Sequence, residues 1–340
     1  MRRSTRLAVA ACAAVVGLAF AGPALSAYSP RLIATSFSNA PGKPTTMLLG
    51  HLQEASDDPT AKDTIYAPPG YVVNLTQPVG TKIGEVSATL ILRDAGNAQV
   101  DVTGEVLADN PALHPSDPCS PGLHQAVWKL NITVAGTPLT VYVYVDSVTA
   151  GPEAAFASAK IQLCLAGPIG TPAGAQLLFA LFDVNGVFTN PSNTADRIWR
   201  ATFTPYTPGT PNPNPVGTTE GQALVPGRVS LTLTVKRLKH RVVLLQGRLL
   251  VDGSPFRGAL VELFTPGKTA RAGKATTNRS GRFSIRKKIK KKTRYYAQVV
   301  FVADLTGCPA APLPGVPQGC KTATVSFAAA TRTVLARPRR

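Results

Sequence analysis

The residues most able to do chemistry in this sequence form a dense basic run between positions 286 and 294. Clustered ammonium and guanidinium groups attract polyanions, because their summed charge creates a strong local potential. The run lies between two segments that we expect to be strands, around Phe283 and from Tyr295 onward, so it should form a strand end and a hairpin turn. The candidate polyanion-binding residues are Arg286, Lys287, Lys288, Lys290, Lys291, Lys292 and Arg294.

Two interpretations of this basic run stay open. As a binding surface it would take an anionic cell-wall polymer, an acidic polysaccharide or lipid head groups as its partner. As a structural feature it would be a solvated sheet edge, since lysines there discourage pairing with other sheets. Specific nucleic-acid recognition is not expected, because Tyr295 and Tyr296 are adjacent and do not form a spaced stacking platform.

Motifs of the common enzyme classes do not occur in the sequence. G-x-S-x-G, G-x-G-x-x-G and H-E-x-x-H are all missing. Residues 267–269 copy the end of a phosphate-binding loop whose required first glycine would fall at Glu262, and residues 183–186 resemble a calcium loop without its later acidic ligand. The histidines show no triad or ligand spacing, and the adjacent Asp57 and Asp58 should face water. We therefore expect no catalytic residue, no metal, no cofactor and no enzyme activity.

The first 27 residues have the order of a secretory signal peptide. Residues 1–6 carry three arginines, residues 7–21 are an unbroken small and apolar run, and small residues follow up to Ala27. This charged, apolar and small-residue order is typical of export signals. We expect cleavage after Ala27, with Ala21 as second choice, and a bacterial protein that is secreted or held at the cell surface.

The same segment offers a lipoprotein alternative, in which Cys12 is acylated. Residues 9–12 resemble a bacterial lipobox, but the apolar run continues well past Cys12, which favours a soluble secreted product. No apolar run reaches the length of about 18 residues that a membrane-spanning helix needs, so the chain should not be transmembrane.

Charge divides the rest of the chain into an acidic and a basic part. Residues 28–227 carry a net charge of −6, whereas residues 228–340 carry +21. Prolines recur every two or three residues from 205 to 215, which favours an extended, polyproline-like path. We therefore predict an acidic domain at 28–205, a Pro/Gly-rich linker at 206–227 and a basic domain at 228–340.

Four cysteines remain once the signal is removed, and an even number in an exported chain predicts two disulfides. Three connectivities are possible, and the domain division favours Cys119–Cys164 and Cys308–Cys320. Zinc is the alternative. It is disfavoured because no pair has C-x-x-C spacing and the nearby His114 and His124 lie in a proline-rich loop.

Short, turn-bounded segments rich in Val, Ile, Thr and aromatic residues recur through the acidic domain and predict β-strands. Residues 141–146, for example, place valines on one face and Tyr142, Tyr144 and Asp146 on the other. No helical period persists over three turns, and residues 28–65 show few periodic signals. About seven closely spaced strands predict an all-β sandwich or barrel. They cover residues 86–93, 98–107, 126–134, 139–148, 159–165, 176–184 and 198–204.

The basic domain carries a more specific pattern. The segments D-G-S-P-F-R-G-A-L-V-E-L-F (252–264) and A-T-T-N-R-S-G-R-F-S-I (275–285) place turns before strands in regular order. Over residues 228–327 this pattern resembles the secreted bacterial Ig-like and carboxypeptidase-regulatory-like (transthyretin-type) β-sandwich domains. The resemblance implies that Gly281 forms the turn before a strand and that Phe283 enters the core. It also implies a structural or adhesive role without catalytic residues.

These features together predict two β-sandwich-type domains joined by a Pro-rich linker, in an exported, non-catalytic protein with a binding or structural role. The first alternative is a polyanion-binding protein that docks the cell envelope through its basic domain. The second is a secreted hydrolase with an unrecognised site in the acidic domain. The role of the loop between Cys308 and Cys320 also has two interpretations. Its apolar residues Leu313 and Val316 would either contact a partner or belong to a surface loop without a partner.

Overall fold

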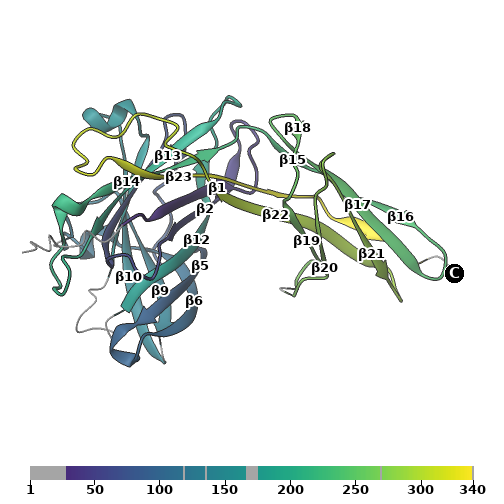
Figure 1. Ribbon diagram of the computed structural model, residues 1–340, viewed down its shortest axis with the longest axis horizontal. Helices are drawn as coiled ribbons and strands as arrows, with labels where there is room; N and C mark the ends of the chain where they lie inside the picture. The colour runs from purple at the N-terminus through teal and green to yellow at the C-terminus, as the bar shows by residue number, and fades with distance from the viewer. Residues whose placement is uncertain (1–27, 118, 135, 166–174, 269, 339–340) are drawn as a thin grey trace, which may run out of the picture.

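The computed structural model describes residues 28–117, 119–134, 136–165, 175–268 and 270–338 (Figure 1). The predicted signal peptide, with its cleavage site and Cys12, lies outside this described part. Within it, the chain forms 24 strands and four short 3-10 helices. None of these described helices is long and apolar enough to cross a membrane. The all-β prediction is confirmed.

The acidic region, residues 28–227, folds as a continuous series of antiparallel strand pairs. Its hydrogen-bonded order is β1, β2, β12, β5, β6, β9, β10, β11, β3, β13 and β14. The series folds over on itself, and both halves contribute to one core that contains Trp128, Phe188, Trp199 and Phe203. The main strands are β1 (Arg31–Ser36), β2 (Pro44–Leu52), β3 (Thr60–Ala67), β5 (Lys82–Leu92), β6 (Ala98–Asp109), β9 (Ala126–Val134), β10 (Thr137–Ser147), β11 (Ala159–Cys164), β12 (Ala175–Thr189), β13 (Arg197–Pro205) and β14 (Thr219–Val225).

Short elements complete the acidic region. They sit in the connections between the long strands and on their margins. They are β4 (Val72–Val73), β7 (Ser116–Asp117), β8 (Ser120–Pro121) and the 3-10 helices η1 (Arg93–Ala95), η2 (Pro111–Leu113), η3 (Pro152–Ala155) and η4 (Pro215–Gly217).

The two ends of the strand series meet through a strand from the basic region. β23 (Cys320–Ala330) pairs in parallel with β14. Its hydroxyl groups also reach β1, since Thr324 and Ser326 donate hydrogen bonds of 2.7 and 2.8 Å to the carbonyl oxygens of Leu32 and Ala34. β23 therefore closes the acidic region by occupying the position between β14 and β1.

The basic region, residues 228–340, is a sandwich of two sheets. In one sheet β17 lies between β21 and the two strands β15 and β16, and β18 pairs with the end of β17. In the other sheet β19 pairs with β20 and β22, and β22 pairs with β23 and β24. The strands are β15 (Val229–Leu231), β16 (Thr234–Arg237), β17 (Val242–Val251), β18 (Ser254–Pro255), β19 (Leu260–Phe264), β20 (Gly273–Thr276), β21 (Arg282–Lys288), β22 (Thr293–Asp304) and β24 (Val334–Ala336).

The core of this sandwich contains the residue that the sequence pattern placed there. Phe283 is buried together with Leu245 from its own sheet and Val261 and Ala297 from the opposite one. Gly281 precedes it with φ +69°, and a Cβ at this position would lie 2.4 Å from the carbonyl oxygen of Leu249. Only glycine fits such a turn without strain.

The predicted linker at 206–227 is wrong for its second half. β14 occupies residues 219–225, is buried, and lies between β13 and β23. The proline series stops at 215, and from 216 to 225 every residue keeps the backbone N–H that a strand requires. The first half also folds back, because Tyr206 is buried and bridged to Pro213.

β23 crosses the boundary that the sequence suggested. Its first half pairs with β14 of the acidic region, and its second half pairs with β22 of the basic region. Figure 1 shows β22 and β23 running side by side from one region into the other. The two regions therefore share a strand, and the C-terminal part of the chain belongs to both.

Three strands, β1 to β3, begin within residues 28–65, a segment that shows few periodic signals. In β1 every residue after Arg31 is buried, and β2 has five buried residues in a row. A strand that is covered on both faces loses the alternation of polar and apolar residues that identifies a half-exposed strand. These strands lack a two-residue alternation of polar and apolar residues because both of their faces are buried.

Candidate polyanion-binding surface

The side chains of β21 alternate between its two faces, and this alternation decides which of its basic residues are exposed. Phe283 and Ile285 point into the core, whereas Ser284 between them and Arg282 and Arg286 on either side are exposed. Because successive side chains of a strand alternate between its faces, Arg282, Arg286 and Lys288 share the exposed face. This strand therefore presents a line of cations to solvent.

Neighbouring strands extend this line into a surface. Arg248 on β17 lies directly opposite Arg282, and Leu244 lies opposite Arg286. On the next strand, β16, Lys236 lies opposite Leu244 and is exposed on the same face. Like charges directly opposite each other destabilise a sheet, so the facing pair Arg248 and Arg282 is unfavourable in the absence of a bound anion.

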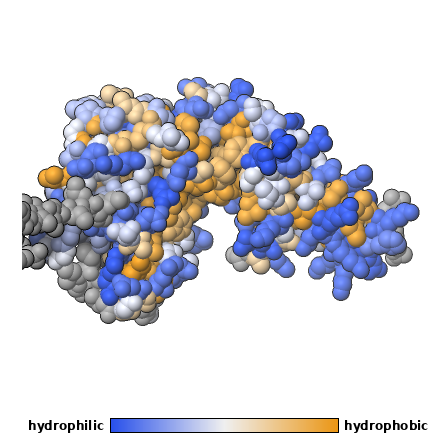
Figure 2. Space-filling model, in the orientation of Figure 1, coloured by the Kyte–Doolittle hydropathy of each residue, from blue (hydrophilic) through white to orange (hydrophobic). Residues whose placement is uncertain are grey.

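The turn between β21 and β22 continues the line beyond the strand. Ile289 is buried and its N–H donates a 2.9 Å hydrogen bond to the carbonyl of Arg241, which anchors the turn to the start of β17. Lys290, Lys291 and Lys292 are all exposed. Figure 2 shows this end of the basic region as predominantly hydrophilic. We call the following set the basic face: Lys236, Arg248, Arg282, Arg286, Lys288, Lys290, Lys291 and Lys292.

Two of the seven residues predicted from the sequence do not join the basic face. Lys287 points to the other side of β21, where its ammonium group donates to the carbonyl oxygen of Ala272. Arg294 lies on β22 in the opposite sheet, beside Leu335 of β24. Conversely, the sequence reasoning missed Arg282, Arg248 and Lys236. The two-residue period of β21 would have identified Arg282, whereas the other two become neighbours only through strand register.

The carboxylates of the basic region all lie away from the basic face. Its sequence contains three acidic residues. Asp252 accepts a hydrogen bond from the backbone of Arg228, Glu262 pairs with Arg271 at 2.6 Å, and Asp304 pairs with Arg31 at 3.2 Å. Across the described residues, no ion pair involves a member of the basic face. Its charge is therefore uncompensated within the part of the chain that the structure describes.

The cysteines form the two predicted disulfides. Cys119 is bonded to Cys164, and Cys308 is bonded to Cys320. Asp117 lies beside the first pair, where it accepts hydrogen bonds from the backbone of Cys119 and from the hydroxyl of Tyr144. Because both sulfur atoms are bonded to each other, this cluster offers no thiolate to a metal.

The two histidines considered as zinc ligands are each held by a carboxylate. His114 Nε2 lies 3.2 Å from Asp109, and His124 Nδ1 lies 2.8 Å from Asp146. The second ring nitrogen of His124 faces the carbonyl oxygen of Ser120 at 2.9 Å. The structure therefore gives these histidines separate partners.

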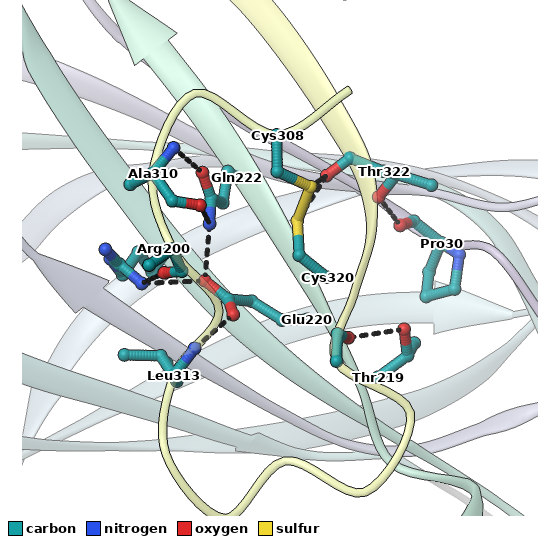
Figure 3. The surroundings of a disulfide bond; sticks show 12 residues. Pro30, Arg200, Thr219, Glu220, Gln222, Cys308, Ala310, Leu313, Cys320 and Thr322 are labelled. Atoms are coloured by element: carbon teal, nitrogen blue, oxygen red, sulfur yellow. Dashed lines mark hydrogen bonds and ion pairs between the residues drawn. A yellow bond between two sulfur atoms is a disulfide. The ribbon is translucent and has the colours of Figure 1, made fainter. Parts of the chain in front are cut away.

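The disulfide loop between Cys308 and Cys320 is covered by the chain itself. Leu313 is buried in a small cluster with Tyr66 and Ala157 of the acidic region, and Val316 packs against it. Figure 3 shows how polar groups fix this contact around Glu220, which is fully buried. The apolar residues of the loop therefore bind an internal partner.

Glu220 uses both oxygens of its carboxylate in this contact. One oxygen accepts hydrogen bonds from Arg200 at 3.0 Å and from Gln222 at 2.9 Å, and the other accepts from the N–H of Leu313 at 2.6 Å. The amide of Gln222 also exchanges two hydrogen bonds with the backbone of Ala310. This buried polar network joins the loop to β13 and β14.

Comparisons with known proteins bring no match: neither a protein-family profile nor a curated protein sequence corresponds to this chain.

Proposed function

We propose that the protein is an exported, non-catalytic binding protein that docks on a linear anionic polymer of the cell envelope through its basic face. The uncompensated charge of this face is the observation that carries the proposal. Eight cations stand on one sheet and its adjoining turn, and every acidic side chain of the basic region has its partner elsewhere. Such a field concentrates polyanions and accelerates their association.

The shape of the basic face favours an extended polymer as its partner. Arg282 and Lys288 mark the two ends of the line on β21, about 20 Å apart at the rise of a strand, and the turn lysines prolong it. A polymer with regularly spaced phosphate or carboxylate groups matches this row over several repeats.

Lipid head groups fit the same surface less well. A membrane-docking surface combines cations with apolar side chains that enter the interface. The large exposed apolar residues of the basic region are on the other sheet of the sandwich. They are Leu260, Val300, Val302 and Leu335.

The surroundings of His51 support a role without catalysis. A hydrolytic triad needs a hydroxyl or thiol nucleophile hydrogen-bonded to a histidine. In the described part of the acidic region, the two ring nitrogens of His51 lie 3.0 Å from oxygens of Asp63 and Gln53. Both nitrogens are engaged by acceptors, which leaves this buried histidine no role as a base toward a nucleophile.

Export is part of the same proposal. The order of the first 27 residues supports it, and the two disulfides are compatible with an oxidising, extracellular compartment. An anionic polymer of the envelope is a partner that an exported cationic protein meets at high local concentration.

Co-sedimentation with defined polyanions tests the proposal. The purified protein should pellet with insoluble cell wall that carries its anionic polymer and remain in solution with wall from which the polymer has been stripped. Vesicles with anionic head groups are the competing arm and should bind more weakly. The face variant R282Q/R286Q/K288Q should lose wall binding. The control K268Q/K321Q/R332Q removes the same charge from exposed positions outside the basic face and should retain it. Equal retention of both variants would refute the proposed surface.

A further inference from the structure

The acidic region encloses a cavity of about 80 Å³ between its layers of strands. Its walls are apolar, aliphatic except for Phe182, and come mainly from β5, β9, β10, β11 and β12. At one end the lining changes to three polar side chains, His51, Thr60 and Asp63, each at most 3% exposed. A mostly apolar cavity with a few converging polar groups is the usual form of a small-molecule site.

The polar end is a preformed hydrogen-bond network. His51 lies between Asp63 and Gln53, and Thr60 donates a 2.6 Å hydrogen bond to the same Gln53 oxygen. The amide nitrogen of Gln53 donates to the carbonyl of Asp58, which fixes the amide oxygen toward His51. Because both ring nitrogens face acceptors, this arrangement favours the doubly protonated form of His51, which forms an ion pair with the Asp63 carboxylate.

One atom of this network has no partner in the described part of the chain. The Oδ2 atom of Asp63 faces His51, whereas its Oδ1 atom is buried and makes no hydrogen bond. A buried carboxylate oxygen without a donor costs free energy. Asp63 is one of the polar residues that line the cavity.

We propose that this cavity binds the donor end of a small, unbranched aliphatic alcohol, whose hydroxyl group donates to Oδ1 of Asp63. The site requires a donor, because the hydrogen-bonding capacity of His51 and Thr60 is already used within the protein. It favours a neutral donor, because the His51–Asp63 pair leaves no net charge facing the cavity, and an ammonium group would be buried without compensation.

The size and opening of the cavity define the rest of the ligand. An apolar cavity of about 150 Å³ holds benzene, so a space of about 80 Å³ admits only a narrower group. A slender chain fits it, and a branched or aromatic group does not. His51, Thr60 and Asp63 are almost fully buried, whereas Leu139, Val141 and Leu177 are partly exposed. The hydroxyl group therefore lies inside, and the chain extends toward the surface.

Two isosteric probes distinguish binding through a hydrogen bond to Asp63 from binding through apolar contacts alone. 1-Butanol and 1-methoxypropane have the same number of heavy atoms, but only the alcohol has a donor. Titrations of the purified full-length protein are followed by the methyl NMR signals of Leu130 and Leu163, which line the cavity. We expect saturable shifts with butanol and binding of the ether about 10- to 100-fold weaker, the loss of one hydrogen bond to a charged group. Equal affinities would overturn the proposal.

A matched pair of variants shows whether the cavity is the binding site. Ala88 lines the cavity, so A88L should fill it and abolish the butanol shifts while leaving the His51–Asp63 pair in place. Ala98 is exposed on the neighbouring strand, so A98L should bind butanol like the parent protein. A water held at Asp63 that butanol fails to displace, with no saturable methyl shifts, would show a hydrated cavity only and overturn the site. None of these results depends on polymer binding.

Discussion

The carboxylate of Glu220 and the backbone N–H of Leu313 are 93 residues apart in sequence and 2.6 Å apart in the fold. This hydrogen bond holds the disulfide loop of the basic region against the acidic region (Figure 3). Together with the pairing of β14 and β23, it fixes how the two regions meet. The basic face therefore lies on a sandwich that is anchored to the acidic region.

Removing the carboxylate of Glu220 should destabilise the protein strongly. In E220A the guanidinium of Arg200 and the N–H of Leu313 lose their buried partner, and breaking one side of a buried ion pair costs about 3–5 kcal/mol. Chemical denaturation measures the free energy of unfolding. The control E262A breaks a more exposed ion pair with Arg271 and should cost about 1 kcal/mol or less. Similar losses in both variants would argue against the buried network.

The two disulfides should differ in their contribution to stability. The Cys119–Cys164 bond closes a sequence separation of 45 residues and the Cys308–Cys320 bond one of 12. Chain entropy then predicts losses of about 4 and about 3 kcal/mol when each pair is replaced by serine. In C308S/C320S, hydrogen exchange at the N–H of Leu313 should also accelerate, whereas C119S/C164S should leave that exchange rate unchanged. The opposite pattern of exchange would contradict the role of the loop.

His51 should make the stability of the protein depend on pH. Burial by itself lowers the pKa of His51, but the charge of Asp63 and hydrogen bonds to Asp63 and Gln53 outweigh it and raise the pKa above its usual value. A raised pKa in the folded state adds stability that is complete below about pH 6.5 and is lost as the pH rises through the folded pKa. The unfolding free energy should therefore fall on the alkaline side of pH 6.5. The variant H51Q should be less stable and should lose this slope, and an unchanged slope would exclude His51 as its source.

Arg282 should strengthen polymer binding while slightly lowering the stability of the fold. Its guanidinium faces Arg248 across the strand pair, and removal of a like-charge contact stabilises a sheet. The variant R282Q should therefore unfold at the same or a slightly higher temperature and bind the polymer less tightly. The control R279Q changes an exposed residue in the turn before β21 and should alter neither property. Loss of thermal stability in R282Q would show that Arg282 serves the fold.

Export predicts a defined N-terminus. In the structure Tyr28 is buried, and its hydroxyl forms a 2.8 Å hydrogen bond with Thr60, so the fold uses the chain from this residue onward. Mass spectrometry of the protein from the culture medium or cell surface should find a chain that begins at Tyr28. A cytoplasmic protein that retains Met1, or a lipid-modified Cys12, would contradict this expectation.

Local patterns in the sequence predicted much of the fold. Alternation and turn residues indicated the strands that became β5, β6 and β9 to β13, and the segment around Gly281 and Phe283 predicted its turn and core position. The disulfide pairing followed from the distribution of the cysteines along the chain. Apart from the Cys119–Cys164 pairing, which spans 45 residues, these features depend on residues that are close in sequence.

Long-range pairing explains what the sequence did not predict. The proline- and glycine-rich composition of residues 206–227 predicts a linker, whereas β14 within it pairs with β23, about 100 residues later. Likewise Arg248 joins Arg282 only through the register of β17 and β21, and Glu220 meets Leu313 only after the loop has folded back. The cavity beside Asp63 arises from strands scattered along the acidic region. No periodic pattern within one segment encodes such contacts.

The salt dependence of polymer binding tests the central claim most directly. Binding of a purified linear anionic polymer to the full-length protein is measured between about 50 and 200 mM salt, where six or more charge contacts predict a loss of affinity of roughly 1,000-fold or more. The face variant R282Q/R286Q/K288Q should bind more weakly and show a slope of log affinity against log salt that is smaller by about three. The control K268Q/K321Q/R332Q should match the parent protein. If the face variant and the control have the same affinity and the same slope, the basic face is not the docking surface.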